Sequence, residues 1–127
     1  MFLSPLLRDP HRLWALHDIT TGELLASSVE AAVDSTSRRR GLLGRTGLDD
    51  EALIIAPCNA VHTFFMRFAI DIVFVDRTGR VLRIAASVPA WRMTVSLRAF
   101  ATIELAAGTA ARNDVAPGHL LSLRSAS

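Results

Sequence analysis

Short apolar stretches recur along the chain, either alternating with polar residues or uninterrupted, and their length of about four to eight residues predicts β-strands. Two of them, residues 13–20 and 23–29, flank a Thr-Gly pair at 21–22 that is typical of tight turns, so we expect a hairpin. Residues 52–56 form a continuous apolar run that ends at Pro57. That run predicts a strand buried on both faces.

The second half of the chain has more segments of this kind. Strands are predicted at residues 61–66, 71–76, 80–85, 101–105 and 119–123. If residues 67–70 form a simple hairpin loop, Met66 pairs with Asp71 and His62 pairs with Val75, all on one face of the sheet. Residues 80–85 follow a Thr-Gly turn, so this half of the chain is predicted to be a meander.

Only two segments favour helices. Residues 35–44 follow candidate capping residues and end at Gly44 or Gly47, and Thr109 can cap a short helix that ends at Asn113. Together with seven or eight short strands, they predict a mainly β fold. We expect a small antiparallel β-sandwich or a partly open barrel with one or two short helices.

Composition narrows the class of protein. The 127 residues are half apolar and one-fifth charged with a net charge of +2, which indicates a single folded domain spanning 1–127. No apolar run approaches the ~20 residues of a membrane span. The first residues have no basic residue ahead of the apolar stretch and contain prolines, so we expect no secretory signal and a cytoplasmic protein. One cysteine, Cys58, excludes an intrachain disulfide and a multi-cysteine zinc site.

Three blocks of sequence carry a family resemblance. Residues 40–45, 62–81 and 104–110 resemble, in order and spacing, the signature blocks of DUF192, a family of small bacterial and archaeal β-rich domains of unknown function. The resemblance frames a core of about residues 25–123, with residues 1–12 as an N-terminal extension. It implies a β-rich fold and assigns no activity, cofactor or catalytic residue.

The chain departs from the family pattern at three places. Ala69 stands where a proline before the Ile-Asp pair is usual, Asn113-Asp114 replaces a usual Leu-Gly, and His119 stands where an aspartate is common. The first change removes a fixed φ angle from the loop before Asp71. The last removes a carboxylate, together with any role that the family gives to it.

Histidine, cysteine and aspartate are the candidates for catalysis. Cys58 and His62 lie four residues apart, and an extended strand of that length separates them by ~13 Å, too far for a nucleophile and its base or for a shared metal ion. The predicted hairpin also leaves Asp71 four positions from His62 along the strand. We therefore expect Cys58 to be an inert thiol and Asp71 to accept backbone N–H bonds or pair with an arginine.

The arginines fall into two groups. Arg40 and Arg45 flank the glycines of the first block and are candidates for an anion site, because guanidinium groups make paired bonds to carboxylate or phosphate. The second group comprises Arg67, Arg77, Arg80, Arg83, Arg92 and Arg98, with only Asp71 and Asp76 opposing it. If part of it shares a sheet face with Phe64, Phe65, Phe68 or Trp91, the combination suits single-stranded nucleic acid or an aromatic anion. The absence of an RNA-binding signature or zinc-knuckle spacing argues against nucleic acid.

These observations favour a binding domain for a small anionic or polar ligand, with no metal or cofactor. The candidate ligand-binding residues are His62, Thr63, Arg67, Asp71, Arg40 and Arg45. Two alternatives remain: a hydrolase-type enzyme that uses His62 with a carboxylate, and a structural or protein-interaction module. A ligand-binding domain requires a pocket into which His62 and an arginine point, whereas an interaction module requires an exposed apolar patch.

Overall fold

The computed structural model describes residues 1–34 and 47–126 of the chain, so the helix predicted at 35–44 lies outside the described residues. The elements are α1 (Ser4–Arg8), β1 (Trp14–Asp18), β2 (Glu23–Ala26), β3 (Ser28–Ala32), β4 (Glu51–Ile55), β5 (Ala60–His62), β6 (Ile70–Val75), β7 (Val81–Val88), β8 (Met93–Val95), β9 (Ala101–Ala106), α3 (Thr109–Arg112) and β10 (Leu121–Ser125). In this part of the chain no helix has the length and apolar character needed to cross a membrane.

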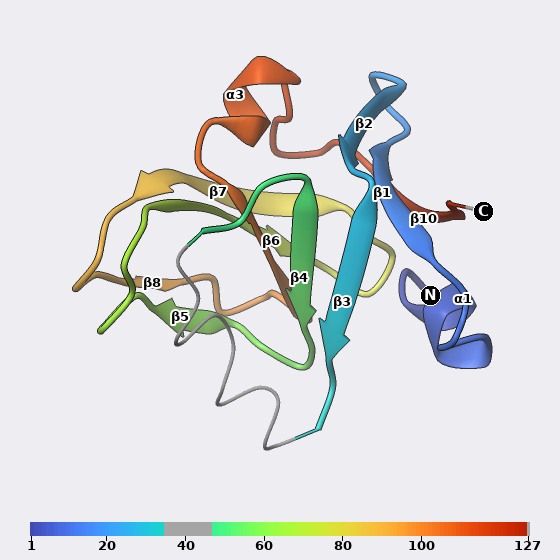
Figure 1. Ribbon diagram of the computed structural model, residues 1–127, viewed down its shortest axis with the longest axis horizontal. Helices are drawn as coiled ribbons and strands as arrows, with labels where there is room; N and C mark the ends of the chain where they lie inside the picture. Colours follow the sequence, from blue (N-terminus) through green and yellow to red (C-terminus); the bar gives the residue numbers. More distant parts are fainter. Residues whose placement is uncertain (35–46, 127) are drawn as a thin grey trace.

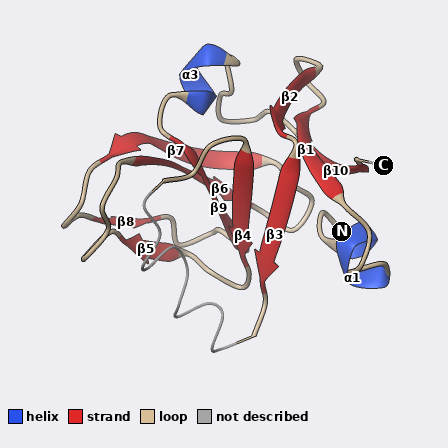
Figure 2. Ribbon diagram, viewed as in Figure 1, coloured by secondary structure: helices blue, strands red, loops and turns tan. Residues whose placement is uncertain are grey.

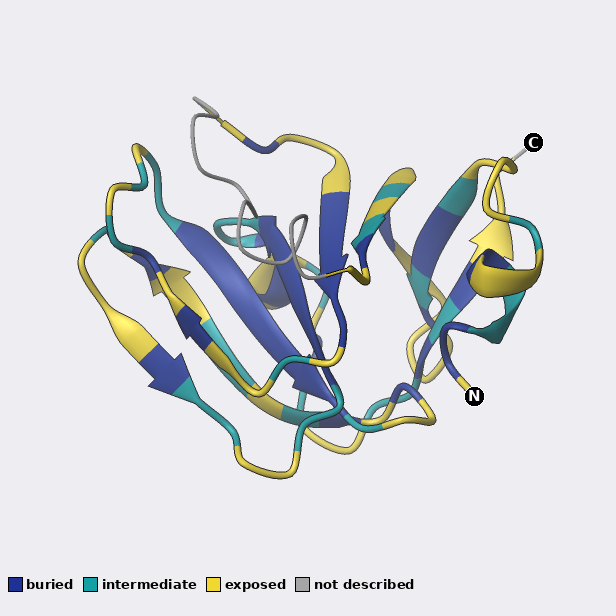
Figure 3. Cartoon of the chain, turned by 90° about the horizontal axis from the view of Figure 1, so that it is seen from below, coloured by how far each residue is buried: buried dark blue, intermediate teal, exposed yellow. Residues whose placement is uncertain are grey.

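A five-stranded sheet forms the centre of the molecule, in the order β3-β4-β9-β6-β7 (Figure 1). Its pairs are antiparallel except β3 with β4, which run parallel. Every residue of β6 is buried, as are five of the six residues of β9, so these two interior strands are covered on both faces. Figure 3 shows these buried strands running through the interior with exposed residues in the surrounding loops.

The two faces of the central sheet bury different clusters, because successive side chains of a strand point to opposite faces. On β6, Val73 and Val75 pack with residues of α1 and of the three-stranded sheet β10-β1-β2. Ile72 and Phe74 pack on the other face with Val61 of β5, which belongs to a two-stranded ribbon, β5-β8. This ribbon and the three-stranded sheet lie at opposite ends of the molecule (Figures 1 and 3).

The predicted fold class is confirmed. The chain is mainly β, with short helices and several sheets that do not close into a barrel (Figure 2). The hairpin of β1 and β2 also forms, but the predicted strand 23–29 ends at Ala26, and β3 begins at Ser28 to pair with β4. Helix α1 and strand β8 were not predicted. Phe2, Leu3 and Leu6 of the predicted extension are buried in the core.

The predicted hairpin of residues 61–66 with 71–76 is wrong. Strand β5 covers only Ala60–His62 and pairs with β8, while β6 pairs with β7 and β9. The physical reason is that β6 is apolar on both faces and takes a central place, where both of its edges are already occupied. The pairings of Met66 with Asp71 and of His62 with Val75 therefore do not form.

Asp71 connects the central sheet to α3. Its side chain is fully buried, and its carboxylate accepts backbone N–H bonds from Ser87 (2.8 Å), Gly108 (3.1 Å) and Ala110 (2.9 Å). Two of these donors belong to the first turn of α3, so Asp71 caps the helix from another element. The prediction that Thr109 caps this helix is wrong, because Gly108 is the N-cap residue and no side-chain cap bond is made there.

The turn between β6 and β7 is held by Asp76. Its Oδ1 accepts bonds from the Thr78 N–H (2.9 Å), the Thr78 hydroxyl (2.6 Å) and the Arg80 N–H (3.0 Å). Burial alone would raise the pKa of Asp76, but these hydrogen bonds and the charge of Arg80 outweigh burial and leave the pKa below its ordinary 3.8. The charged form of Asp76 therefore fixes the turn that leads to Gly79.

We predict that Asp71→Ala lowers the free energy of unfolding by about 3 kcal/mol, because it leaves three backbone N–H groups without their charged acceptor. Urea denaturation measures the change. Asp49→Ala, which removes the same charge from an exposed position, serves as the control and is expected to stay within about 0.5 kcal/mol of the parent chain. Unchanged stability in Asp71→Ala would show that the carboxylate is not a structural cap.

Gly79 generates a second prediction. Its φ is +92°, and a Cβ there would lie 2.5 Å from the Leu121 carbonyl oxygen and 2.7 Å from Cδ1 of Phe2. Gly79→Ala is expected to cost about 3 kcal/mol of stability, from backbone strain plus overpacking. Gly22→Ala has a similar φ of +84° with nothing within 4 Å, and is expected to cost about 1 kcal/mol. Equal losses in the two variants, compared by thermal unfolding, would contradict this close packing.

Candidate functional site

Four rings form a continuous contact series on the β5-β8 ribbon and the loops beside it, and we call this set the ring array: His62, Phe64, Trp91 and Phe65. The centroids of His62 and Phe64 lie 5.0 Å apart in a stacked arrangement, and Phe64 stacks on Trp91 at 5.6 Å. Phe65 meets Trp91 edge to face at 4.7 Å. These separations are those of favourable aromatic pairs.

The outer rings of the array are exposed to solvent. Phe65 is 71% exposed and Trp91 is 58% exposed, and Met93, which pairs with His62 across the ribbon, is 65% exposed. The alternation of the ribbon explains this placement, since Val61 and Thr94 point inward and are buried. The result is an exposed apolar patch built from large side chains.

Thr63 holds the two loops of the array together. It is fully buried, and its hydroxyl donates to the Pro89 carbonyl (2.6 Å) and accepts from the Arg92 N–H (2.9 Å). Its backbone N–H donates to the Arg92 carbonyl, and its carbonyl accepts from the N–H groups of Trp91 and Met66. One buried threonine therefore fixes both the turn that carries Phe65 and the loop that carries Trp91.

Both exposed rings stand on left-handed backbone. Phe65 has a φ of 64° and Trp91 a φ of 65°, a conformation that bulky residues rarely adopt and that costs on the order of 1–3 kcal/mol each. Phe65 occupies a turn position where glycine is the usual residue. The hydrogen bonds of Thr63 maintain this strained arrangement, which presents two rings to solvent. Such strain is concentrated at functional sites in proteins.

Arginines accompany the ring array in sequence. Residues 56–69 and 77–100 contain six arginines and no aspartate or glutamate, but Arg77 and Arg80 belong to the β6-β7 turn, which contacts Phe100, Gly118 and Leu120 instead of the rings. Arg67 and Arg92 are exposed and follow the rings closely in sequence, and within the described residues neither forms an ion pair with a carboxylate. Arg92 Nη1 donates to the Trp91 carbonyl at 3.4 Å, and Arg83 Nη1 donates to the Val95 carbonyl at the far end of β8. Both guanidinium groups are therefore anchored along one strand.

The structure brings some of the predicted site residues together and separates others. His62 and Thr63 belong to the ring array or its support, and Arg67 lies in the loop that follows. Asp71 is fully buried and caps α3. Arg40 and Arg45 lie outside the described residues.

The predicted chemistry of His62 and Cys58 can be compared with their contacts. In the described part of the chain, His62 stacks on Phe64 and has no carboxylate partner. The Cys58 thiol donates to the Ala60 carbonyl at 3.2 Å. Across residues 1–34 and 47–126, no three side chains of His, Cys, Asp or Glu gather to hold a metal ion.

A histidine–carboxylate pair does occur at the opposite end of the molecule. His119 Nδ1 lies 2.8 Å from Oδ2 of Asp18, which is fully buried, and Oδ1 of Asp18 accepts the Thr20 N–H. The two residues are 101 positions apart, so no local pattern in the sequence indicates their contact. Position 119 was recognised only as a departure from the family pattern.

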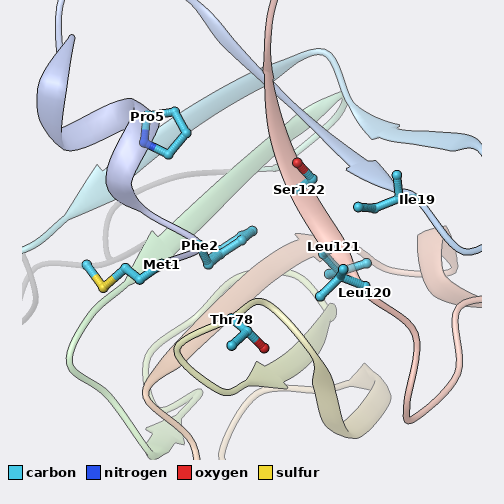
Figure 4. Close-up of a pocket in the computed structure, with 8 residues that line it drawn as sticks. All are labelled: Met1, Phe2, Pro5, Ile19, Thr78, Leu120, Leu121 and Ser122. Atoms are coloured by element: carbon cyan, nitrogen blue, oxygen red, sulfur yellow. The ribbon is translucent and has the colours of Figure 1, made fainter.

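An open groove of about 340 Å³ lies near that pair (Figure 4). It is lined by Met1, Phe2, Pro5, Ile19, Thr78, Leu120, Leu121 and Ser122. Of the predicted ligand-binding residues that the structure describes, none lines this groove. His62 and Thr63 instead belong to the ring array and its support.

Two solved structures share the fold. A protein of unknown function from Novosphingobium aromaticivorans superposes with a TM-score of 0.74 at 24% identity, over 87% of this chain and 83% of that one. A protein from Sinorhizobium meliloti, described as a "putative transcription regulator", superposes with a TM-score of 0.75 at 23% identity, over 87% of this chain and 92% of that one. The search of curated proteins found no significant match.

The family model of DUF192, described as "Uncharacterized ACR", matches residues 17–123. This range contains the ring array, Thr63 and Asp71, and it begins eight residues before the core framed by the signature blocks, which started at about residue 25. The chain belongs to the DUF192 family.

Proposed function

We propose that this domain is a binding module that recognises a flat, anionic aromatic ligand on the ring array. The planar part of the ligand stacks on the exposed faces or edges of Trp91 and Phe65. Its negative charge bonds to Arg92 or Arg67, which lie in the same two loops. The ligand-binding role predicted for His62, Thr63 and Arg67 is kept in this proposal, with Thr63 as a positioning residue.

The observation that carries the proposal is the pair of left-handed aromatic residues. Phe65 and Trp91 are both strained, both exposed and in contact with each other, and both are held by Thr63. A packing role does not account for them, since these side chains bury little surface. Presentation of rings to a ligand does account for them, because a preorganised surface loses less entropy when it binds.

The cations define the charge of the ligand. Arg67 and Arg92 are exposed in the same two loops as Phe65 and Trp91, so two guanidinium groups accompany the rings and favour an anionic ligand. Arginine also stacks on aromatic groups and makes paired hydrogen bonds to phosphate or carboxylate. A neutral aromatic compound would use only half of this surface.

Recognition without catalysis fits the described contacts better than hydrolysis. A general base needs a partner that orients its ring and a nucleophile within reach. Within residues 1–34 and 47–126, His62 has a stacked phenylalanine in place of such a partner. The interaction-module alternative shares the exposed patch with our proposal and differs from it in the nature of the ligand.

Tryptophan fluorescence tests the proposal directly. The chain has two tryptophans, so a Trp14→Phe variant reports on Trp91 alone. We predict that adenosine monophosphate quenches Trp91 with a Kd of about 1 mM, as expected for one stacking contact and one charge-assisted hydrogen bond. Adenosine and inorganic phosphate, which each supply half of the interaction, are expected to bind about tenfold more weakly.

Two variants complete the experiment. Arg92→Gln is expected to weaken the binding of adenosine monophosphate by about tenfold and to leave the binding of adenosine unchanged. Trp91→Phe retains Trp14, which lies outside the array. The fluorescence of Trp14 in this variant is expected to show no response to adenosine monophosphate. Chemical-shift changes of the Trp91 indole in the parent chain provide the same measurement without a variant. Absence of any response of Trp91 to adenosine monophosphate would overturn the proposal.

A further inference from the structure

We infer, on the basis of the proposed function, that the anionic aromatic ligand is a nucleotide of a single-stranded nucleic acid, whose phosphates follow β8 from Arg92 to Arg83. The base of one nucleotide stacks on the exposed rings of Trp91 and Phe65. The backbone then continues along the ribbon. The occupant is thus a polyanion that carries planar rings, not a single small molecule.

The spacing of the anchored cations supports a polyanion. Arg92 Nη1 bonds to the carbonyl of residue 91, two residues before β8, and Arg83 Nη1 bonds to the carbonyl of residue 95, the last residue of β8. The two guanidinium groups are thus held at separate points along the chain. Successive phosphates of one strand can bond to both of them.

The anchored arginines retain binding capacity. Each guanidinium has five N–H donors, and the described contacts use one of them on Arg83 and one on Arg92. Arg98 is also exposed, in the turn closed by the bond from the Ala99 N–H to the Ser96 carbonyl. Arg83 and Arg92 therefore keep donors that can bond to phosphate groups.

The rings favour single-stranded nucleic acid over an acidic peptide or a duplex. Bases of a single strand stack on aromatic side chains at about 1–3 kcal/mol per base with little dependence on sequence, and basic residues then track the backbone. An acidic peptide satisfies the arginines and leaves the rings exposed. A duplex satisfies the arginines but keeps its bases stacked on each other and unavailable.

The sequence lacks a known RNA-binding signature, but arginines that share a sheet face with Phe64, Phe65, Phe68 or Trp91 would suit single-stranded nucleic acid. The ring array places Phe64, Phe65 and Trp91 in contact beside Arg92. These contacts are made in loops and not on a sheet face. They join two loops that lie more than 20 residues apart, which no short motif would reveal.

The test compares a monomer with an oligomer. Deoxyadenosine monophosphate and single-stranded oligodeoxyadenylate of about eight nucleotides are titrated into the Trp14→Phe variant while the fluorescence of Trp91 is followed, or into the parent chain while the Trp91 indole chemical shift is followed. We expect the oligomer to bind at least about tenfold more tightly than the monomer. Its log Kd is expected to vary with log salt concentration with a slope of magnitude about 1.4, as for two phosphate contacts.

Arg83→Gln separates the inference from the proposed function. This variant is expected to weaken the binding of the oligomer by about threefold to tenfold and to reduce the magnitude of the salt slope of log Kd by about 0.7. Its affinity for the monomer is expected to stay unchanged, which also shows that the ring array is intact. Arg8→Gln, in α1 at the opposite end of the molecule, removes the same charge and is expected to change neither affinity.

Each other outcome has a defined meaning. Equal affinity for monomer and oligomer, or no effect of Arg83→Gln on the oligomer, overturns the nucleic-acid inference and leaves the proposed function standing. Equally tight binding of a DNA duplex or of an oligoglutamate peptide also overturns it, because neither offers free bases to the rings. Failure of both monomer and oligomer to bind overturns the inference together with the proposed function.

Discussion

The hydroxyl of Thr63 is the interaction on which the architecture of the site depends. It donates to the Pro89 carbonyl and accepts from the Arg92 N–H, and so joins two loops that the chain separates by 26 residues or more. Because the group is fully buried, an unpaired partner would cost about 1–3 kcal/mol, and water does not compete for the bonds. The free energy of these hydrogen bonds offsets the backbone strain at Phe65 and Trp91. Without them we expect both residues to relax to ordinary backbone conformations and the ring array to separate.

The remainder of the fold supplies a rigid support for these loops. Strands β6 and β9 are buried almost completely. Val61 anchors the β5-β8 ribbon to one face of the central sheet, and the exposed face of the ribbon carries His62 and Met93. Asp71 fixes α3 to the same sheet through three backbone donors. Such a support keeps the strained rings in place before a ligand binds. Loops on a mobile scaffold would instead lose conformational entropy during binding, which would weaken the affinity.

Sequence analysis could predict the fold class because short apolar strands and a few turns carry local signals. It recovered the hairpin of β1 and β2 and the positions of β4, β6, β7 and β9 to within one to three residues. It failed at residues 61–66, because the loop length suggested that they pair with β6, whose two edges are occupied by β7 and β9. It missed the short strand β8, and with it the partner of β5.

The site was recovered only in part, for a related reason. His62, Thr63 and Arg67 were selected as individual residues, but their organisation depends on Trp91 and on hydrogen bonds between distant loops. Asp71 was correctly interpreted as an acceptor of backbone N–H bonds, although a ligand role was also assigned to it. The contact of Asp18 with His119 spans almost the whole chain, and single-sequence patterns hold no information about it.

The central claim is that one buried hydroxyl keeps the exposed rings in contact, and a comparison of Thr63→Val with Thr63→Ser tests it most directly. Both variants are small changes, and only serine retains the hydroxyl. The measurement is the nuclear Overhauser effect between the Phe65 ring and the Trp91 indole. The account predicts that this effect persists in the serine variant and disappears in the valine variant while the core signals of β6 remain. Persistence of the ring contact in Thr63→Val would contradict it.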